Sequence, residues 1–127
     1  MIETKKVFIS GPMSGIEDCN RTAFMEAEIL LKRAGFDVFN PIIFAGLEGW
    51  SESEIMDLDL TALSKCNAIY QLDGWENSGG ANVEWAYAKK CGLEVINHSW
   101  LDWYDDEMWK MANRDLCPAG IMVDEGA

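Results

Sequence analysis

The chain has 127 residues, 49% of them hydrophobic, which excludes a disordered protein and indicates one folded domain. Ten basic and 22 acidic residues give a formal net charge of −12. This charge argues against a partner such as duplex nucleic acid or an anionic membrane surface, since both attract Lys and Arg. No stretch approaches the roughly 20 apolar residues that span a bilayer, and no signal peptide is evident. We therefore expect a cytoplasmic, single-domain protein over residues 1–127, with a core at about 5–113 and a tail at 114–127.

Strands and helices are predicted to alternate along the chain. In order, the pattern predicts a strand over 5–10, a helix capped by Asn20 and closed by Gly35, a strand over 36–40, a helix over about 51–66, a strand over 67–73, a helix over 81–91, a strand over 93–97 and a helix over about 99–113. Capping boxes are predicted at Ser51 with Glu54 and at Ser99 with Asp102. The alternation indicates an α/β fold, a doubly wound parallel sheet with helices on both faces. Residues 115–127 are predicted to be a loose tail or a short edge strand at 121–123.

The cysteines and the single histidine do not have the spacing of a metal site. No CxxC motif occurs, and His98 has no candidate ligand beside it in the sequence. Structural zinc needs four closely paired Cys or His ligands. We therefore expect no bound metal and cysteines in the reduced form.

The first segment that could carry chemistry is Ser10-Gly11-Pro12-Met13-Ser14-Gly15, directly after the first predicted strand. In open α/β sheets, ligands bind beyond the carboxyl ends of the strands. Glycines and small hydroxyls let the backbone approach a ligand closely. The segment is neither a Walker loop nor a dinucleotide fingerprint, and an ordinary tight turn remains the alternative.

The second segment, residues 78–84, contains Glu84 near a helix N-terminus. Helical spacing places Ala81, Ala88 and Cys91 on the same face as Glu84, so the carboxylate is expected on an apolar face. A first-turn Glu stabilised by the helix dipole is the alternative. Acidic side chains are seldom buried without a partner or a task, and this favours a functional role.

The third segment, Asp57-Leu58-Asp59-Leu60, offers a second carboxylate. Asp59 shares its helical face with apolar positions, whereas Asp57 shares a polar face, so Asp59 is predicted to point inward and Asp57 to be solvated. Two carboxylates in one pocket suit glycosidic-bond chemistry, in which one acts as nucleophile and the other handles the proton. A cluster of Trp100, Trp103 and Tyr104 on one helical face is interpreted as core or subunit-interface packing rather than base stacking.

The order and spacing of these motifs resemble the nucleoside 2-deoxyribosyltransferase-like superfamily. The motifs are SGPMSG after a strand, Asn20 before a helix, Asn40-Pro41, the run from Asp59 to Leu63, and SxGxxxE ending at Glu84. The resemblance covers roughly residues 5–97 and is strongest to a small branch common in phages and prophages, similar to the 2′-deoxynucleoside 5′-phosphate N-hydrolases. It implies a flavodoxin-like or Rossmann-like three-layer sandwich. It implies no metal or organic cofactor, and a homodimer or larger homo-oligomer.

The resemblance also implies roles for individual residues. Glu84 matches the nucleophile that forms a covalent deoxyribosyl adduct, and Asp59 matches the aspartate that contacts the substrate and shuttles the proton. Gly11 to Gly15 match a loop lining the sugar and phosphate site, next to Ser10. Ser78, near Gly80, matches a serine that holds the 5′-phosphate in the nucleotide hydrolases, where the nucleoside transferases tend to carry an acidic residue.

These observations predict an enzyme that hydrolyses or transfers the N-glycosidic bond of a (deoxy)nucleoside 5′-monophosphate. One alternative is a catalytically weak protein that binds and sequesters a nucleotide-derived ligand, which needs the pocket but not the pair of carboxylates. Another is an acidic interaction protein such as a nucleic-acid mimic, whose acidic residues would form one continuous face.

Overall fold

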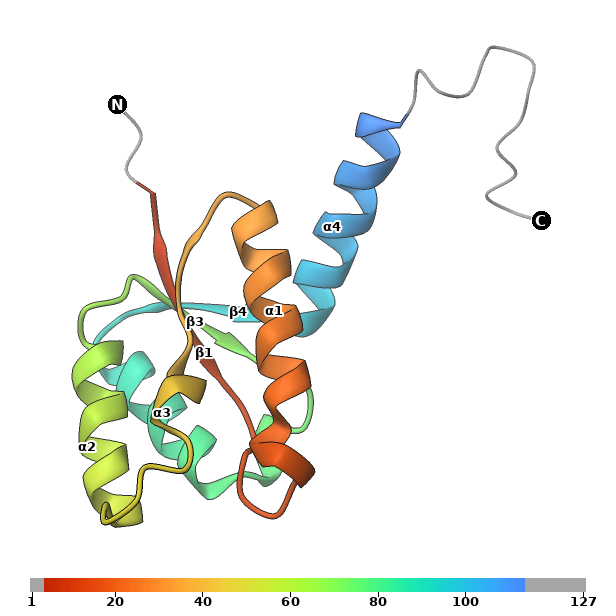
Figure 1. The fold of residues 1–127 in the computed structure, drawn as a ribbon. Helices are drawn as coiled ribbons and strands as arrows, with labels where there is room; N and C mark the ends of the chain where they lie inside the picture. The colour runs from red at the N-terminus through yellow and green to blue at the C-terminus, as the bar shows by residue number, and fades with distance from the viewer. Residues whose placement is uncertain (1–3, 114–127) are drawn as a thin grey trace, which may run out of the picture.

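The structure is a computed structural model that describes residues 4–113. Its centre is a four-stranded sheet with the order β2-β1-β3-β4, in which all three neighbouring pairs are parallel (Figure 1). The strands are β1 (Lys6–Ser10), β2 (Asp37–Phe39), β3 (Ala68–Gln71) and β4 (Glu94–Asn97). The long helices are α1 (Arg21–Arg33), α2 (Glu52–Leu63), α3 (Gly79–Lys90) and α4 (His98–Ala112). The predicted α/β, doubly wound parallel fold is therefore confirmed.

The helices form one layer on each face of the sheet, α1 and α4 on one face and α2 and α3 on the other (Figure 1). Successive residues of a strand point to opposite faces. Accordingly, Val7 and Ile9 of β1 pack in the cluster that contains Phe24 of α1 and Leu101 of α4. Phe8 packs in the other cluster, with Leu63 at the end of α2 and Ala88 of α3. Ser10 follows Phe8 by two positions, so the same alternation directs it toward α2 and α3.

The predicted capping box of α2 is confirmed: Ser51 Oγ accepts the Glu54 N–H, and the Glu54 carboxylate accepts the Ser51 N–H. The box predicted at Ser99 is wrong. Asn97 Oδ1 accepts the Trp100 N–H at 2.9 Å, so α4 begins at His98 and Ser99 already lies within it. The Asn97 side chain sits at the end of a paired strand and caps the helix two residues earlier, so Ser99 has helical backbone geometry and cannot serve as the N-cap.

Asn20 occupies the N-cap position of α1, as predicted, but makes no side-chain capping bond. It adopts a left-handed backbone, φ 62°, as do Asp18 and Cys19 before it, and its side chain accepts no N–H from the helix. Instead Asn20 Nδ2 donates to the backbone carbonyl of Pro12 at 3.0 Å. The amide therefore ties the start of α1 to the loop that follows β1.

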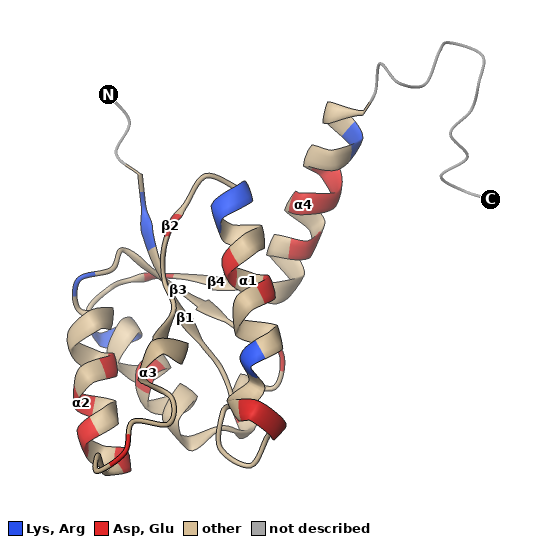
Figure 2. Cartoon of the chain, viewed as in Figure 1, with Lys and Arg blue, Asp and Glu red and all other residues tan. Residues whose placement is uncertain are grey.

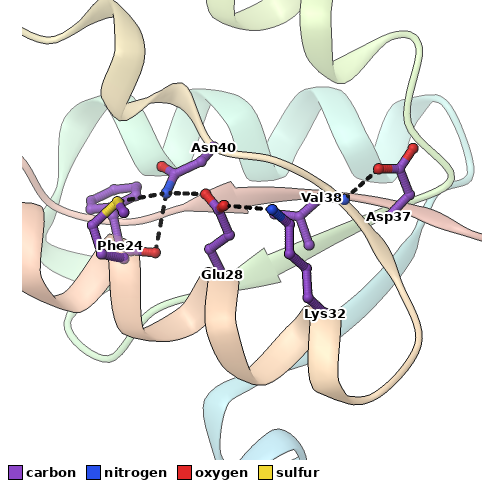
Figure 3. Close-up of polar contacts among 7 residues, drawn as sticks. Phe24, Glu28, Lys32, Asp37, Val38 and Asn40 are labelled. Atoms are coloured by element: carbon purple, nitrogen blue, oxygen red, sulfur yellow. Dashed lines mark hydrogen bonds and ion pairs between the residues drawn. The ribbon is translucent and has the colours of Figure 1, made fainter.

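A buried amide joins α1 to the end of β2 (Figure 3). Asn40 Nδ2 donates to the Phe24 carbonyl at 3.2 Å and to Glu28 Oε1 at 3.0 Å, while its Oδ1 accepts the Ile42 N–H. The bonds from Lys32 and Asn40 hold the pKa of Glu28 below its usual value. Asn40 thus fixes the chain direction at the entrance to the short helix η2 (Pro41–Phe44).

Replacing Asn40 by alanine is expected to lower the free energy of unfolding by about 2–3 kcal/mol. The change leaves the buried Ile42 N–H without a partner, which costs about 1–3 kcal/mol, and it also removes the bonds from the amide to the Phe24 carbonyl and to Glu28. Urea denaturation followed by circular dichroism measures the effect. Asn113→Ala, which removes an exposed amide bond to the Trp109 carbonyl, should change stability by no more than about 0.5 kcal/mol.

The tryptophans of α4 divide between packed and exposed positions. Trp100 stacks on Tyr104 with ring centroids 5.1 Å apart and contacts Phe36, whereas Trp103 and Trp109 are each 59% exposed. Trp100 and Tyr104 therefore pack against each other within the chain, although Trp100 is still 39% exposed, and Trp103 lies outside this contact.

Acidic residues lie on several helices, with basic residues between them (Figure 2). Within residues 4–113, no helix is long and apolar enough to cross a membrane. The edge strand predicted at 121–123 lies outside the described residues.

Candidate active site

A cavity of about 700 Å³ opens beyond the carboxyl ends of the central strands. Three parts of the chain line it: the loop after β1, residues 41–56 with the start of α2, and the N-terminal half of α3. Of the predicted site residues, seven line the cavity: Gly11, Met13, Ser14, Asp59, Ser78, Gly80 and Glu84. Ser10, Pro12 and Gly15 do not.

Glu84 projects from the second turn of α3 and is only 5% exposed. Ala81 and Ala88, one turn before and after it, are buried as the helical spacing predicts. Cys91, the third residue expected on this face, is exposed because it lies at the C-cap, beyond the last turn. The small alanine side chains let α3 approach the sheet closely, so Glu84 reaches the floor of the cavity.

Asp59 of α2 supplies the second carboxyl group and is 8% exposed, whereas Asp57 is on the solvated face. The prediction that the two aspartates face opposite ways is confirmed. Asp59 and Glu84 meet across the groove between α2 and α3, near enough for each carboxyl group to shift the pKa of the other. Asp59 Oδ1 is buried and has no hydrogen-bond partner in the described protein.

The structure places Ser10 beneath Glu84 rather than at the cavity surface. Ser10 is 1% exposed, and its hydroxyl donates to Glu84 Oε1 at 2.6 Å. The contact links the end of β1 to α3, two elements that are 74 residues apart in sequence.

Burial raises the pKa of both acids. It raises the pKa of Asp59 to about 6. It raises the pKa of Glu84 well above its usual value; the bond from Ser10 opposes this, and the neighbouring Asp59 adds to it. Two carboxyl groups this close do not readily ionise together: Glu84 lowers the pKa of Asp59 and Asp59 raises the pKa of Glu84, so Asp59 loses its proton first and Glu84 keeps its proton to higher pH.

The loop after β1 approaches the sheet closely at Gly11. A Cβ built on this glycine would lie 2.7 Å from the Cβ and Cδ1 of Leu72, so no other residue fits without displacing the strand end. Met13 and Ser14 then reach the cavity. Pro12 and Gly15 shape the loop: the Pro12 carbonyl accepts the Asn20 amide, and Gly15 adopts φ 78°.

The N-terminus of α3 lies at the cavity wall. Ser78 is its N-cap, and its Oγ accepts the Ala81 N–H at 3.2 Å, which leaves the hydroxyl proton free to donate elsewhere. Gly79 and Gly80 follow, and the first N–H groups of a helix have no intrahelical partner. A Cβ on Gly79 would meet nothing within 4 Å. This wall therefore offers donors and a positive dipole end to a ligand.

The third wall, formed by residues 41–56, was not predicted from the sequence. Its apolar surface includes Phe44, Leu47, Trp50 and Met56. Trp50 is 49% exposed, so about half of its surface remains open to solvent or to a ligand. The topology could have predicted this wall. The segment follows the second parallel strand, so it emerges at the same edge of the sheet as the loop after β1.

The cavity is acidic. Its described lining includes the carboxyl groups of Glu52, Asp59 and Glu84 but no Lys, Arg or His. Within the described part of the chain, no group of three or more His, Cys, Asp and Glu side chains is placed to hold a metal ion. An anionic group in this cavity would therefore be held by N–H and hydroxyl donors.

Comparisons with known proteins place this arrangement in a family. The chain is similar to BlsM, whose solution structure is 18% identical, covers 92% of this chain and 97% of that one, and gives a TM-score of 0.56. This likeness supports the fold alone. No curated protein matches the chain. Residues 5–97, which include the loop after β1, Asp59, Ser78 and Glu84, match the family described as a domain of unknown function, DUF4406, and the chain belongs to that family.

Proposed function

We propose that this protein cleaves the N-glycosidic bond of a (deoxy)nucleoside 5′-monophosphate, by hydrolysis or by transfer to a second base. The observation that carries the proposal is the pair of buried carboxyl groups, Asp59 and Glu84, in contact at the floor of a cavity large enough for a nucleotide. Retaining cleavage of a glycosidic bond needs two carboxyl groups, an ionised one that acts as nucleophile and a protonated one that acts as general acid.

In the resting pair Asp59 loses its proton first and Glu84 keeps one, so the reaction begins with transfer of that proton from Glu84 to Asp59, which leaves Glu84 ionised. Glu84 attacks C1′ as the bond from C1′ to the base nitrogen breaks, and Asp59 gives its proton to the departing base. The sugar is then esterified to Glu84. In the second step Asp59 takes a proton from water, the hydroxide attacks C1′, and Glu84 leaves as carboxylate. In a transfer, the N–H of a second base replaces water.

The cavity walls suit the other parts of such a substrate. The apolar surface from Phe44 to Met56, with Trp50 at its rim, can cover a nucleobase face. The start of α3 can hold a 5′-phosphate with N–H groups and the Ser78 hydroxyl. This arrangement needs no basic residue, consistent with a lining that has none among the described residues.

Incubation of the protein with a panel of nucleosides and nucleoside monophosphates, followed by chromatography, tests the proposal by the release of a free base. If no base is released from any member while a nucleotide still binds, the catalytic proposal fails and the protein is a nucleotide-binding one.

Ser78→Ala is expected to lower kcat/KM for the monophosphate by roughly 10- to 150-fold and to leave nucleoside cleavage nearly unchanged. A hydrogen bond to a charged group contributes about 1.5–3 kcal/mol, which corresponds to that range. The measurement is steady-state kinetics on a matched nucleoside and monophosphate pair.

Ser78 also caps α3, so its loss should cost about 1 kcal/mol of stability. Asn97→Ala, which removes the cap of α4 away from the cavity, controls for that loss. Equal effects of Ser78→Ala on both substrates would contradict a role at the 5′ end.

A further inference from the structure

Ser10 has a role different from that of the other residues in its loop. We propose that Ser10 is the positioning residue of Glu84: its hydroxyl holds Oε1 against the sheet, which leaves Oε2 as the oxygen that attacks C1′. The inference deepens the proposed function and rests on it for the identity of the reaction, but the contact itself can be tested without a substrate.

The geometry of this contact is well defined. Ser10 Oγ lies 2.6 Å from Glu84 Oε1, and both side chains are at least 95% buried, with exposed fractions of 1% and 5%. Ser10 is the last residue of β1 and is paired in register with Gln71 of β3, so its position is fixed by the central strands. A carboxylate on a helix would otherwise be free to rotate about its terminal torsion. The bond removes that freedom on one oxygen.

The contact also has an electrostatic consequence. Desolvation opposes the ionisation of Glu84, and the hydrogen bond from Ser10 lowers the pKa of Glu84 against that trend. Since the carboxylate is the attacking form, the same bond that orients Glu84 also increases the fraction that can react.

Gln71 provides a matched comparison for Ser10. It ends the neighbouring strand, its Cα is paired with that of Ser10, and strand alternation places both side chains on the face covered by α2 and α3. Gln71 is 3% exposed, and its Nε2 is buried without a hydrogen-bond partner in the described protein. Gln71→Leu therefore removes a buried polar side chain beside Ser10 without removing a bond to Glu84.

The first test is a titration of the full-length protein labelled with carbon-13 at the glutamate carboxyls, with Glu84 assigned from the spectrum of Glu84→Gln. In Ser10→Ala, the Glu84 transition is expected to move up by about one to two pH units, the equivalent of one hydrogen bond to a charged group. Ser10→Cys, whose thiol is a weak donor, should fall between Ser10→Ala and wild type. Gln71→Leu should titrate like wild type.

The second test is kinetic. Ser10→Ala should lower kcat by roughly 10- to 100-fold with KM nearly unchanged, because misplacing a reacting group by about 1 Å can cost 10²-fold. Its pH profile should move up with the titration. A Glu84 transition that is the same in wild type, Ser10→Ala and Ser10→Cys overturns the proposal. Failure of wild type to cleave any substrate would instead refute the proposed function, and the titration would still decide the role of Ser10.

Discussion

Replacing Glu84 by glutamine is expected to abolish base release, with a loss of at least about 10³-fold in kcat. The amide keeps the size and shape of the side chain but cannot form a stable ester with C1′, so the covalent route is lost. Glu84→Ala should be equally inactive. Chromatographic detection of the free base over long incubations measures the residual rate, and near-wild-type turnover by Glu84→Gln would contradict the assignment of this nucleophile.

The same variant also shows whether a loss of activity is due to unfolding, because Glu84→Gln is expected to be more stable than wild type at alkaline pH. The folded protein binds the protons of Asp59 and Glu84 more tightly than the unfolded chain does, because burial raises both pKa values. Wild-type stability from this pair is therefore fully present below about pH 4 and is lost as pH rises through 6 and beyond.

Glu84→Gln removes one of the two acids and so removes much of that loss. We expect a gain of about 1–3 kcal/mol at pH 8, or roughly 4–11 °C in Tm, that shrinks toward pH 5. Thermal denaturation from pH 5 to 8 measures it. If the Tm difference does not change with pH over this range, the two acids do not titrate as a buried pair.

The sequence was sufficient to predict those features that depend on periodicity. A helix repeats every 3.6 residues, so the apolar neighbours of Asp59 and Glu84 identified both as inward-facing and Asp57 as solvated. The alternation of strands and helices likewise predicted the layers and the edge of the sheet at which the cavity opens. The directions of the three acidic side chains follow from residues within about two helical turns, and the layers follow from the order of the elements alone.

Features that depend on competition between groups could not be predicted in this way. Ser99 has the right spacing for a capping box, but Asn97 reaches the same turn first from a fixed strand end. Ser10 belongs to a sequence motif that is typical of a loop, yet the sheet register places it beneath Glu84 of α3, which is 74 residues away in sequence. The wall containing Trp50 has little periodic signal, because residues 41–51 lie in η2 and a loop and only its last residues belong to α2.

Asp59→Asn is expected to lower kcat by roughly 10²-fold or more, the usual contribution of a positioned proton donor and acceptor. Asp59 is the acid beside Glu84, and its pKa of about 6 is close enough to neutral pH for it to take up the proton of Glu84 and pass it to the leaving base within one turnover. The amide of asparagine can bond to Glu84 but cannot transfer a proton. The loss should be smaller for substrates whose base leaves without protonation, such as a nucleoside with a cationic base, and this comparison separates proton transfer from substrate binding.

Asp57→Asn is the matched control, since it makes the same chemical change two residues away on the solvated face of α2. It should leave kcat and KM within about twofold of wild type and shift stability by no more than about 0.5 kcal/mol. Steady-state kinetics of the two variants, each with a good and a poor leaving group, decides the matter. Because the helix turns about 200° between positions 57 and 59, only one of the two carboxyls can face Glu84. Equal losses in Asp57→Asn and Asp59→Asn would mean that the variants act through the total charge of α2 rather than through a proton carried by Asp59.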